Sequence, residues 1–388
     1  MKSRSTQITP AATRDERIRL CLAIELSKKS WDVLVCSPLS AKLSRYRNAA
    51  GDGAALLALI ERLRTRAEGK LGKAVEVVSC YEAGYDGFWL HRLLAAHGID
   101  SKVFDPASLQ VSRRARQAKT DRIDGERLLR ALLAYLRGEP RVVSVVRVPS
   151  VADEDARRLH RERDRLVGER VQHVNRIKGL CATQGVYDFE PLRRDRMGRL
   201  EGLRTGDGCT LPVRLKAEIE REIKRLELVL TMIDSIEKER NAILDETKTA
   251  DHPNATKIRA LAKLKGIAAE FSSVLVGEVY YKDFDNRRQV ASYVGLAPSP
   301  FASGAMQRDQ GISKAGNPKA RTTAIELAWM WLRHQPASVL SVWFRERVGS
   351  LKGRPRRIAV VALARKLLVA LWRYLETGLV PEGAVLKA

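Results

Sequence analysis

Residues 18–36, IRLCLAIELSKKSWDVLVC, hold two apolar runs rich in Ile, Leu and Val, separated by a short polar segment at Ser27 to Ser30. Runs of this length that flank a polar turn predict two strands joined as a hairpin. Glu25 interrupts the first run, where a buried charge without a partner would be costly. This stretch therefore predicts a sheet that carries a carboxylate on its first strand.

The segments that follow predict the rest of one α/β domain over 15–148. A third strand is expected near 41–48, and GDGAALLALIERLRTRAEG has apolar residues at helical spacing up to Gly69. AVEVVSCYEAG is a nearly continuous apolar run, which is typical of a strand buried on both faces. A helix at 86–97, a strand at 101–105 and a helix at 120–137 complete the series. The order β-β-β-α-β-α-β-α is that of a ribonuclease H-like domain.

The remainder of the chain predicts two mainly helical regions. Over 149–250, two long segments of dense mixed charge have apolar residues every three or four positions, which predicts an antiparallel helical hairpin or coiled coil. Over 251–388 we expect a mostly helical C-terminal domain with a Gly-rich loop at 295–317 and a basic tail helix. ALAKLKGIAAEF, around Gly266, resembles half of a helix-hairpin-helix.

The charge of the chain indicates a polyanionic partner. Lys and Arg number 70 against 46 Asp and Glu, a formal net charge of +24, so nucleic acid is the expected ligand. The five cysteines form no Cys-x-x-Cys pair and the six histidines complete no zinc spacing, so we expect no structural zinc. The first residues hold no apolar core of a signal peptide, and charged residues interrupt the longest apolar stretch. We expect a soluble, cytoplasmic protein without a membrane partner.

Four carboxylates fall where a ribonuclease H-like fold would bring them together. Glu25 lies on the first strand, Glu82 ends the fourth, and Asp121 and Asp124 share one face of a helix at i, i+3. Ligands that are all oxygen suit Mg²⁺ or Mn²⁺, and two such ions are typical of phosphodiester exchange. The alternative is that Glu82 caps a surface strand while the aspartates pair with nearby arginines such as Arg122.

Six segments together carry a family resemblance. They are AIELSKKSWDV, CYEAGYDGFWL, QAKTDRIDGERLLR, LAKLKGIAAEFSSVLVGEV, FDNRRQVASYVGLAPSPFASG and GISKAGNPKARTTAIELAW. In these segments the sequence resembles, almost from end to end, the DEDD-type insertion-sequence transposases, which include a pilin-gene inverting recombinase and the bridge-RNA-guided recombinases. The resemblance implies a RuvC-like four-acid set at Glu25, Glu82, Asp121 and Asp124. The first acid of the family is usually Asp, so Glu25 is a departure, and Asp32 is a second candidate.

The resemblance also implies a serine nucleophile, Ser303, in the C-terminal domain. A serine hydroxyl can attack a phosphodiester to form a covalent link if a base or a metal activates it. From the residues alone, an ordinary loop serine beside a turn glycine is the favoured interpretation of Ser303, and Ser299 and Ser313 are nearby alternatives for the nucleophile. The resemblance further implies a structured guide RNA encoded by the element and assembly as a homo-dimer or tetramer.

Basic residues in three segments are candidate phosphate contacts. One precedes the predicted helix at 120–137, one lies in and after the Gly-rich loop, and one is the tail segment, which could instead be a solvated helix. The candidates are Arg113, Arg114, Arg116, Lys119, Arg308, Lys314, Lys319, Arg321, Arg354, Arg356 and Arg357. Trp329, Trp331, Trp343 and Trp372 lie in apolar helical segments and are expected in the core.

The function favoured by these observations is a transposase or site-specific recombinase that cuts and rejoins DNA. A nuclease that uses the acids alone, with Ser303 structural, is the first alternative. A nucleic-acid-binding protein with a decayed metal site is the second, and Glu25 is the residue that favours it.

Overall fold

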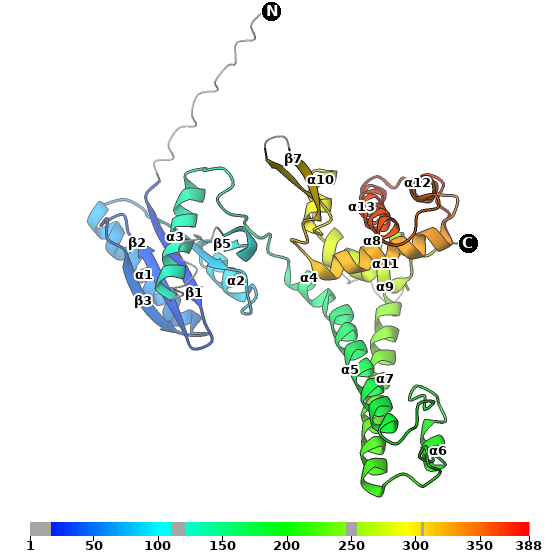
Figure 1. Cartoon of the computed structure of the whole chain (residues 1–388). Helices are drawn as coiled ribbons and strands as arrows, with labels where there is room; N and C mark the ends of the chain where they lie inside the picture. Colours follow the sequence, from blue (N-terminus) through cyan, green and yellow to red (C-terminus); the bar gives the residue numbers. More distant parts are fainter. Residues whose placement is uncertain (1–16, 110–120, 246–253, 304–305, 388) are drawn as a thin grey trace, which may run out of the picture. The chain divides into compact units, whose positions relative to one another are not determined.

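The computed structural model describes residues 17–109, 121–245, 254–303 and 306–387, and it divides the chain into two compact units, Met1–Val148 and Pro149–Ala388. Figure 1 labels the elements of each. We call them the N-terminal unit and the C-terminal unit. Among the described residues, no helix is both long enough and apolar enough to cross a membrane.

The N-terminal unit is built on one mixed sheet of five strands in the order β3-β2-β1-β4-β5. The antiparallel pairs are β1 with β2 and β2 with β3, whereas β4 runs parallel to both β1 and β5. The hairpin predicted at 18–36 is confirmed. The strands are β1 Arg19–Leu26, β2 Ser30–Cys36, β3 Ser44–Ala49, β4 Glu76–Glu82 and β5 Asp100–Phe104.

Helices cover both faces of this sheet. One core contains Leu22 of β1 together with side chains of α1 Gly53–Leu71 and α2 Trp89–Ala96, and the other contains Ala23 with side chains of α3 Asp121–Leu136. A short helix, η1 Pro106–Ser108, follows β5. A mixed sheet with these helices is consistent with the ribonuclease H-like domain that the sequence predicts.

The first helix continues beyond its predicted end. Gly69 lies inside α1, and the helix ends at Gly72, whose φ of +65° provides the left-handed cap. Gly69 was misleading because the glycine that ends a helix is the one that adopts a positive φ.

Two long helices, α5 Arg158–Ala182 and α7 Val213–Ala242, pack against each other in the C-terminal unit (Figure 1). Three interhelical contacts between basic and acidic side chains, Arg163–Glu237, His173–Glu222 and Arg176–Glu218, have N···O distances of 2.7, 2.7 and 2.6 Å. Partner numbers fall along α7 as they rise along α5, so the helices run antiparallel. The short helix α4 Val151–Ala156 precedes them. Coiled-coil geometry stays a prediction.

The connection between these helices is packed, although its sequence shows no clear period. It contains the short helix α6 Arg196–Glu201, and Val186, Phe189 and Leu200 are buried against Ile223 of α7. Its apolar residues are too widely spaced to show a helical or strand period, so the sequence could not reveal this small core.

The rest of the C-terminal unit is mostly helical, with Trp331 at 0% exposure in its core. Trp329, in contrast, is 40% exposed, so its expected place in the core is wrong. The Gly-rich segment contains a β-hairpin that the sequence analysis missed. The elements are α8 Ala255–Ala262, α9 Ala269–Leu275, η4 Val276–Tyr280, α10 Arg287–Tyr293, β6 Pro298–Ser303, β7 Met306–Ile312, α11 Pro318–His334, α12 Val339–Val348 and α13 Arg354–Thr377.

Candidate active site

Glu25 and Glu82 lie side by side on the sheet and point to the same face. The parallel register pairs Ile24 with Tyr81, so Glu25 and Glu82 are the next pair along it. Because side chains alternate along a strand, both lie on the face of Ala23 and Cys80, which packs against α3. Both are half-buried. Neighbouring strands are about 4.8 Å apart, so this register brings two carboxylates together.

Asp124 reaches the same place from α3. Arg127, one turn further on, has its Nη2 3.4 Å from Asp124 Oδ1 and 3.6 Å from Glu82 Oε2. The Arg127 Nε is buried and has no hydrogen-bond partner in the structure. One positive charge therefore lies between two carboxylates that come from different elements.

Gly125 allows α3 to approach the sheet at this point. A Cβ placed on Gly125 would lie 2.7 Å from Cδ1 of Leu34 on β2, which is closer than real Cβ contacts. A larger residue at this position would displace either Leu34 or helix α3, and displacement of α3 would also move the adjacent Asp124. No local sequence pattern marks Gly125 as a residue of the site.

Asp32 has its own charged partners. It lies directly opposite Glu25 in the β1–β2 register and is 3% exposed. Burial alone would raise its pKa, but hydrogen bonds from Arg45 at 2.7 Å and Arg47 at 3.3 Å outweigh burial and hold the pKa below its ordinary value. Asp32 is thus a compensated structural carboxylate, which leaves Glu25 as the first candidate acid.

These carboxylates suit a divalent cation. Oxygen ligands are what Mg²⁺ and Mn²⁺ prefer, and here a guanidinium supplies the positive charge between two of them. Asp121 begins α3, but its side chain lies outside the described part of the structure. Among the side chains that are described, no group of three or more acidic, His or Cys residues forms a ready metal site.

Ser303 is the last residue of β6, at the end of the hairpin. Its backbone pairs with Met306 of β7, while its side chain and that of Arg308 lie outside the described part of the structure. The base of the hairpin is closed by two glycines. A Cβ on Gly295 would lie 2.1 Å from the Ala315 oxygen, and one on Gly316 would lie 2.2 Å from the Tyr293 oxygen.

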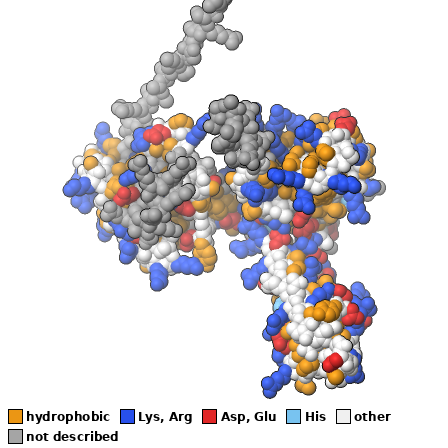
Figure 2. Space-filling model, viewed as in Figure 1, with side chains coloured by type: hydrophobic (Ala, Val, Ile, Leu, Met, Phe, Trp, Pro, Cys, Tyr) orange, Lys and Arg blue, Asp and Glu red, His pale blue; other side chains and the backbone are white. Residues whose placement is uncertain are grey.

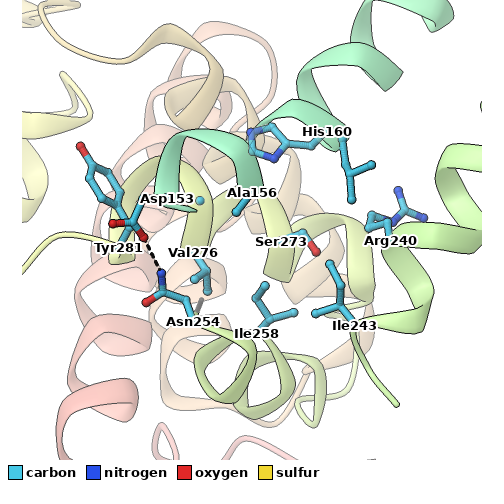
Figure 3. Close-up of a pocket in the computed structure, with 12 residues that line it drawn as sticks. Asp153, Ala156, His160, Arg240, Ile243, Asn254, Ile258, Ser273, Val276 and Tyr281 are labelled. Atoms are coloured by element: carbon cyan, nitrogen blue, oxygen red, sulfur yellow. Dashed lines mark hydrogen bonds between the residues drawn. The ribbon is translucent and has the colours of Figure 1, made fainter. Parts of the chain in front are cut away.

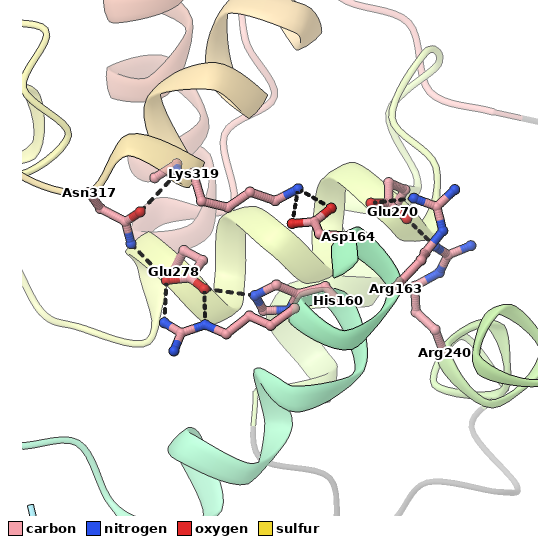
Figure 4. A network of polar contacts seen from close by, with 10 residues as sticks. His160, Arg163, Asp164, Arg240, Glu270, Glu278, Asn317 and Lys319 are labelled. Carbon is pink, nitrogen blue, oxygen red and sulfur yellow. Dashed lines mark hydrogen bonds and ion pairs between the residues drawn. The ribbon is translucent and has the colours of Figure 1, made fainter. Parts of the chain in front are cut away.

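Glu278 is a buried carboxylate beside this base, and the sequence analysis missed it (Figure 4). It accepts hydrogen bonds from His160 Nε2 at 2.8 Å, Arg161 Nε at 2.8 Å and Asn317 Nδ2 at 2.7 Å. Burial alone would raise its pKa, but these hydrogen bonds and the charge of Arg161 hold the pKa well below its ordinary value. Asn317 also caps α11, since its Oδ1 accepts from the Ala320 amide at 3.1 Å.

A small pocket lies next to His160, and Figure 3 shows its lining. Asn254 Nδ2 donates to Asp153 at 2.9 Å across one side of it. The Ser273 hydroxyl is buried there without a hydrogen-bond partner in the structure. Its lining comes from α4, α5, α7, α8, α9 and η4 and consists of buried and half-buried residues.

The candidate phosphate contacts differ in how free they are. Arg354, Arg356 and Arg357 are exposed at the start of α13. Lys319 forms an ion pair with Asp164 at 2.6 Å, and Arg321 Nη1 donates to the Val294 and Lys314 oxygens. Figure 2 shows Lys and Arg side chains spread over the described surface. Arg113, Arg114, Arg116 and Lys119 lie outside the described residues.

Comparison with known proteins decides the family. A family model described as a DEDD transposase of the IS110 type matches residues 22–183, and the model of the transposase IS116/IS110/IS902 family matches residues 258–341. The chain is 51% identical over 385 residues, 97% of each chain, to y4rJ of Sinorhizobium fredii, which is named as a transposase. The chain belongs to the IS110 family of DEDD transposases. It is also 25% identical over 291 residues, 74% of each chain, to the transposase for insertion sequence element IS1111A of Coxiella burnetii.

As a DEDD transposase of an insertion sequence, the chain is an enzyme that acts on DNA. The family generally implies use of a divalent metal. The first matched region includes β4, α3 and the part of β1 that carries Glu25, and the second includes the hairpin of β6 and β7, whose first strand ends at Ser303.

Proposed function

We propose that this transposase cuts and rejoins DNA with four carboxylates, Glu25, Glu82, Asp121 and Asp124, and with Ser303 as nucleophile. The observation that supports the acids is the convergence of Glu82 and Asp124 on one guanidinium nitrogen, with Glu25 beside Glu82 in the strand register. The proposed ions are Mg²⁺ or Mn²⁺, bound as a pair, which is typical of phosphodiester exchange.

When bound, such ions supply charge neutralisation at the transferring phosphate and activation of the attacking hydroxyl. The chain's own carboxylates hold the positive charge in place, and Ser303 provides the oxygen that attacks phosphorus. In that step the serine Oγ–P bond forms, the P–O bond to a sugar breaks, and the serine proton passes to the released sugar oxygen. Rejoining is the reverse reaction with a different sugar hydroxyl.

Glu278 and the two glycines support the serine through the backbone. Asn317 joins Glu278 to the first turn of α11, and Gly316 joins that turn to the strand β7. Movement at this base would move the whole hairpin, so we assign these residues a positioning role.

The exposed arginines at the start of α13 are proposed as phosphate contacts, together with Lys314. A structured guide RNA and assembly as a dimer or tetramer are further proposals that rest on the family membership. They are tested by purifying the full chain, extracting any retained RNA for sequencing, and measuring the mass of the complex in solution.

The acids are tested by substitution. Glu82→Ala, Asp121→Ala and Asp124→Ala should each reduce strand cleavage by at least about a hundredfold, with DNA binding nearly unchanged, because each removes a ligand of the proposed metal ions rather than a phosphate contact. Glu25→Asp should keep activity, since the shorter acid is the family's usual residue. Asp32→Asn is the matched control for loss of a carboxylate from the same sheet. Cleavage at the normal rate in all three alanine variants would refute the proposed site.

A further inference from the structure

Two loops lie at the edge of the sheet where the acid-bearing strands end. β1 and β4 run parallel, so the turn after Glu25 and the loop after Glu82 leave the sheet at the same edge. Lys28 lies three residues after Glu25, and Tyr85 lies three residues after Glu82. Nothing in the proposed chemistry uses either side chain.

Tyr85 is held outward by an ordered loop. It is 88% exposed, more than any other large apolar side chain that the structure describes. The loop is fixed by three hydrogen bonds: Ala83 N to Phe104 O at 2.9 Å, Gly87 N to Gly84 O at 3.2 Å and Tyr81 Oη to Gly87 O at 3.2 Å. The loop therefore fixes the position of a ring that is exposed to solvent.

Lys28 lies over the same ring. Its Nζ is 5.0 Å from the centroid of Tyr85, within the range of a cation–π contact. The turn that carries Lys28 is fixed by Ser27, whose hydroxyl donates to the Ser30 oxygen at 2.6 Å and accepts from the Ser30 amide at 3.2 Å. A cation and an aromatic face are thus presented together just beyond the ends of the strands that carry Glu25 and Glu82.

An ammonium group and an aromatic face are the two groups that bind an unpaired nucleotide. The ammonium contacts a phosphate oxygen, and the ring stacks on a base of any sequence. A base inside a duplex offers no free face for stacking, so this pair favours a nucleotide that has left the stack.

We propose that Lys28 and Tyr85 bind an unpaired DNA nucleotide next to the phosphate that the enzyme cuts. The Lys28 ammonium contacts a phosphate oxygen of this nucleotide, and the Tyr85 ring stacks on its base. The proposal rests on the assignment of the active site to Glu25, Glu82, Asp121 and Asp124. It adds a substrate contact at the edge of the sheet where these carboxylates lie.

The test uses the full chain and DNA that carries the ends of its own insertion element, with 5-iododeoxyuridine placed singly at positions on both sides of the cleavage site. Irradiation should crosslink Tyr85 to one position within a few nucleotides of that site. Tyr85→Ala should remove the crosslink and raise KM for cleavage about 5- to 100-fold, the range expected for loss of one stacked base. Tyr85→Phe keeps the ring and should stay within about twofold of the unmodified enzyme.

Tyr187→Ala is the matched control, because Tyr187 is 82% exposed but lies in the connection before α6, in the other unit. It should leave KM unchanged. The proposal is overturned if Tyr85→Ala behaves like Tyr187→Ala, if the crosslink maps far from the cleavage site, or if Tyr85 crosslinks only to RNA of the same sequence. Glu82→Ala should still form the crosslink, so loss of the proposed catalytic role and loss of the Tyr85 contact give different results.

Discussion

Glu82 and Asp124 approach the same nitrogen of Arg127 from two different elements, with their oxygens 3.6 and 3.4 Å from Nη2. Without a cation, two carboxylates this close would repel each other. Arg127 therefore relieves their repulsion when no divalent ion is bound, and a bound ion must compete with it.

This relationship predicts how Mg²⁺ affects stability. Arg127→Gln removes the internal cation, so added Mg²⁺ should raise the melting temperature of this variant more than that of the unmodified chain. Thermal unfolding with and without Mg²⁺, at constant ionic strength, measures the difference. Arg130→Gln is the control, because Arg130 is 79% exposed and pairs with Glu126 on the outer face of the helix. Equal Mg²⁺ shifts in both variants would argue against an ion between Glu82 and Asp124.

The buried carboxylate of Glu278 predicts a pH dependence of stability. Its pKa is lowered in the folded chain, so the stability it contributes is fully present above the ordinary value near 4.3 and is lost as the pH falls toward the folded value. Glu278→Gln should lower the free energy of unfolding at pH 7 by about 3 kcal/mol, a typical result of breaking a buried ion pair. The substitution should also reduce the fall in the free energy of unfolding that the unmodified chain shows between about pH 5 and pH 3.

Chemical denaturation across this pH range measures both effects. Glu326→Gln, a change at an exposed glutamate of α11, should alter neither. A Glu278→Gln variant as stable as the unmodified chain at pH 7 would show that the network contributes nothing to folding.

Salt dependence separates phosphate contacts from structural arginines. With six to ten phosphate contacts, DNA affinity should fall on the order of a thousandfold between about 50 and 200 mM salt. In a plot of the logarithm of DNA affinity against the logarithm of salt concentration, each phosphate contact adds roughly 0.9 to the steepness of the slope. Joint replacement of Arg354, Arg356 and Arg357 by Gln should therefore make this slope shallower by up to about three. Arg321→Gln should instead lower thermal stability, because its guanidinium holds the backbone of residues 294 and 314. A slope unchanged by the triple replacement would remove α13 from the interface.

The sequence made Glu25 and Glu82 candidates because each places a charge in an apolar strand, and it made Asp121 and Asp124 candidates because their i, i+3 spacing puts them on one face of a helix. Glu25 and Glu82 stand out in apolar strands, and the strand order then places them side by side. The same pattern occurs at Glu278, a lone acid within the apolar segment SVLVGEVYY, although Glu278 was not among the predicted site residues. A charge inside an apolar run predicts a compensating partner wherever it occurs, because a buried unpaired charge is costly.

Other features depend on contacts between distant residues and left no local pattern. Arg127 is an ordinary charged residue on a helix until the fold brings Glu82 next to it. The hairpin of β6 and β7 was missed because its sequence contains Gly and Pro and has weak strand propensity. It is formed by backbone pairing between the two strands and by the close backbone approaches at Gly295 and Gly316, which no local pattern predicts. The exposure of Trp329 likewise depends on which helices pack around α11.

A covalent protein–DNA adduct that depends on Ser303 would identify the nucleophile. The unmodified enzyme, incubated with element ends and Mg²⁺, should form an adduct that resists denaturation, and peptide mapping should place the DNA on Ser303. Ser303→Ala should lose both the adduct and strand exchange while keeping DNA binding, because no other group replaces the nucleophile. Glu82→Ala should lose the adduct as well. Strand exchange at the normal rate by Ser303→Ala would show that Ser303 is not the nucleophile and would turn the search to Ser299 or Ser313.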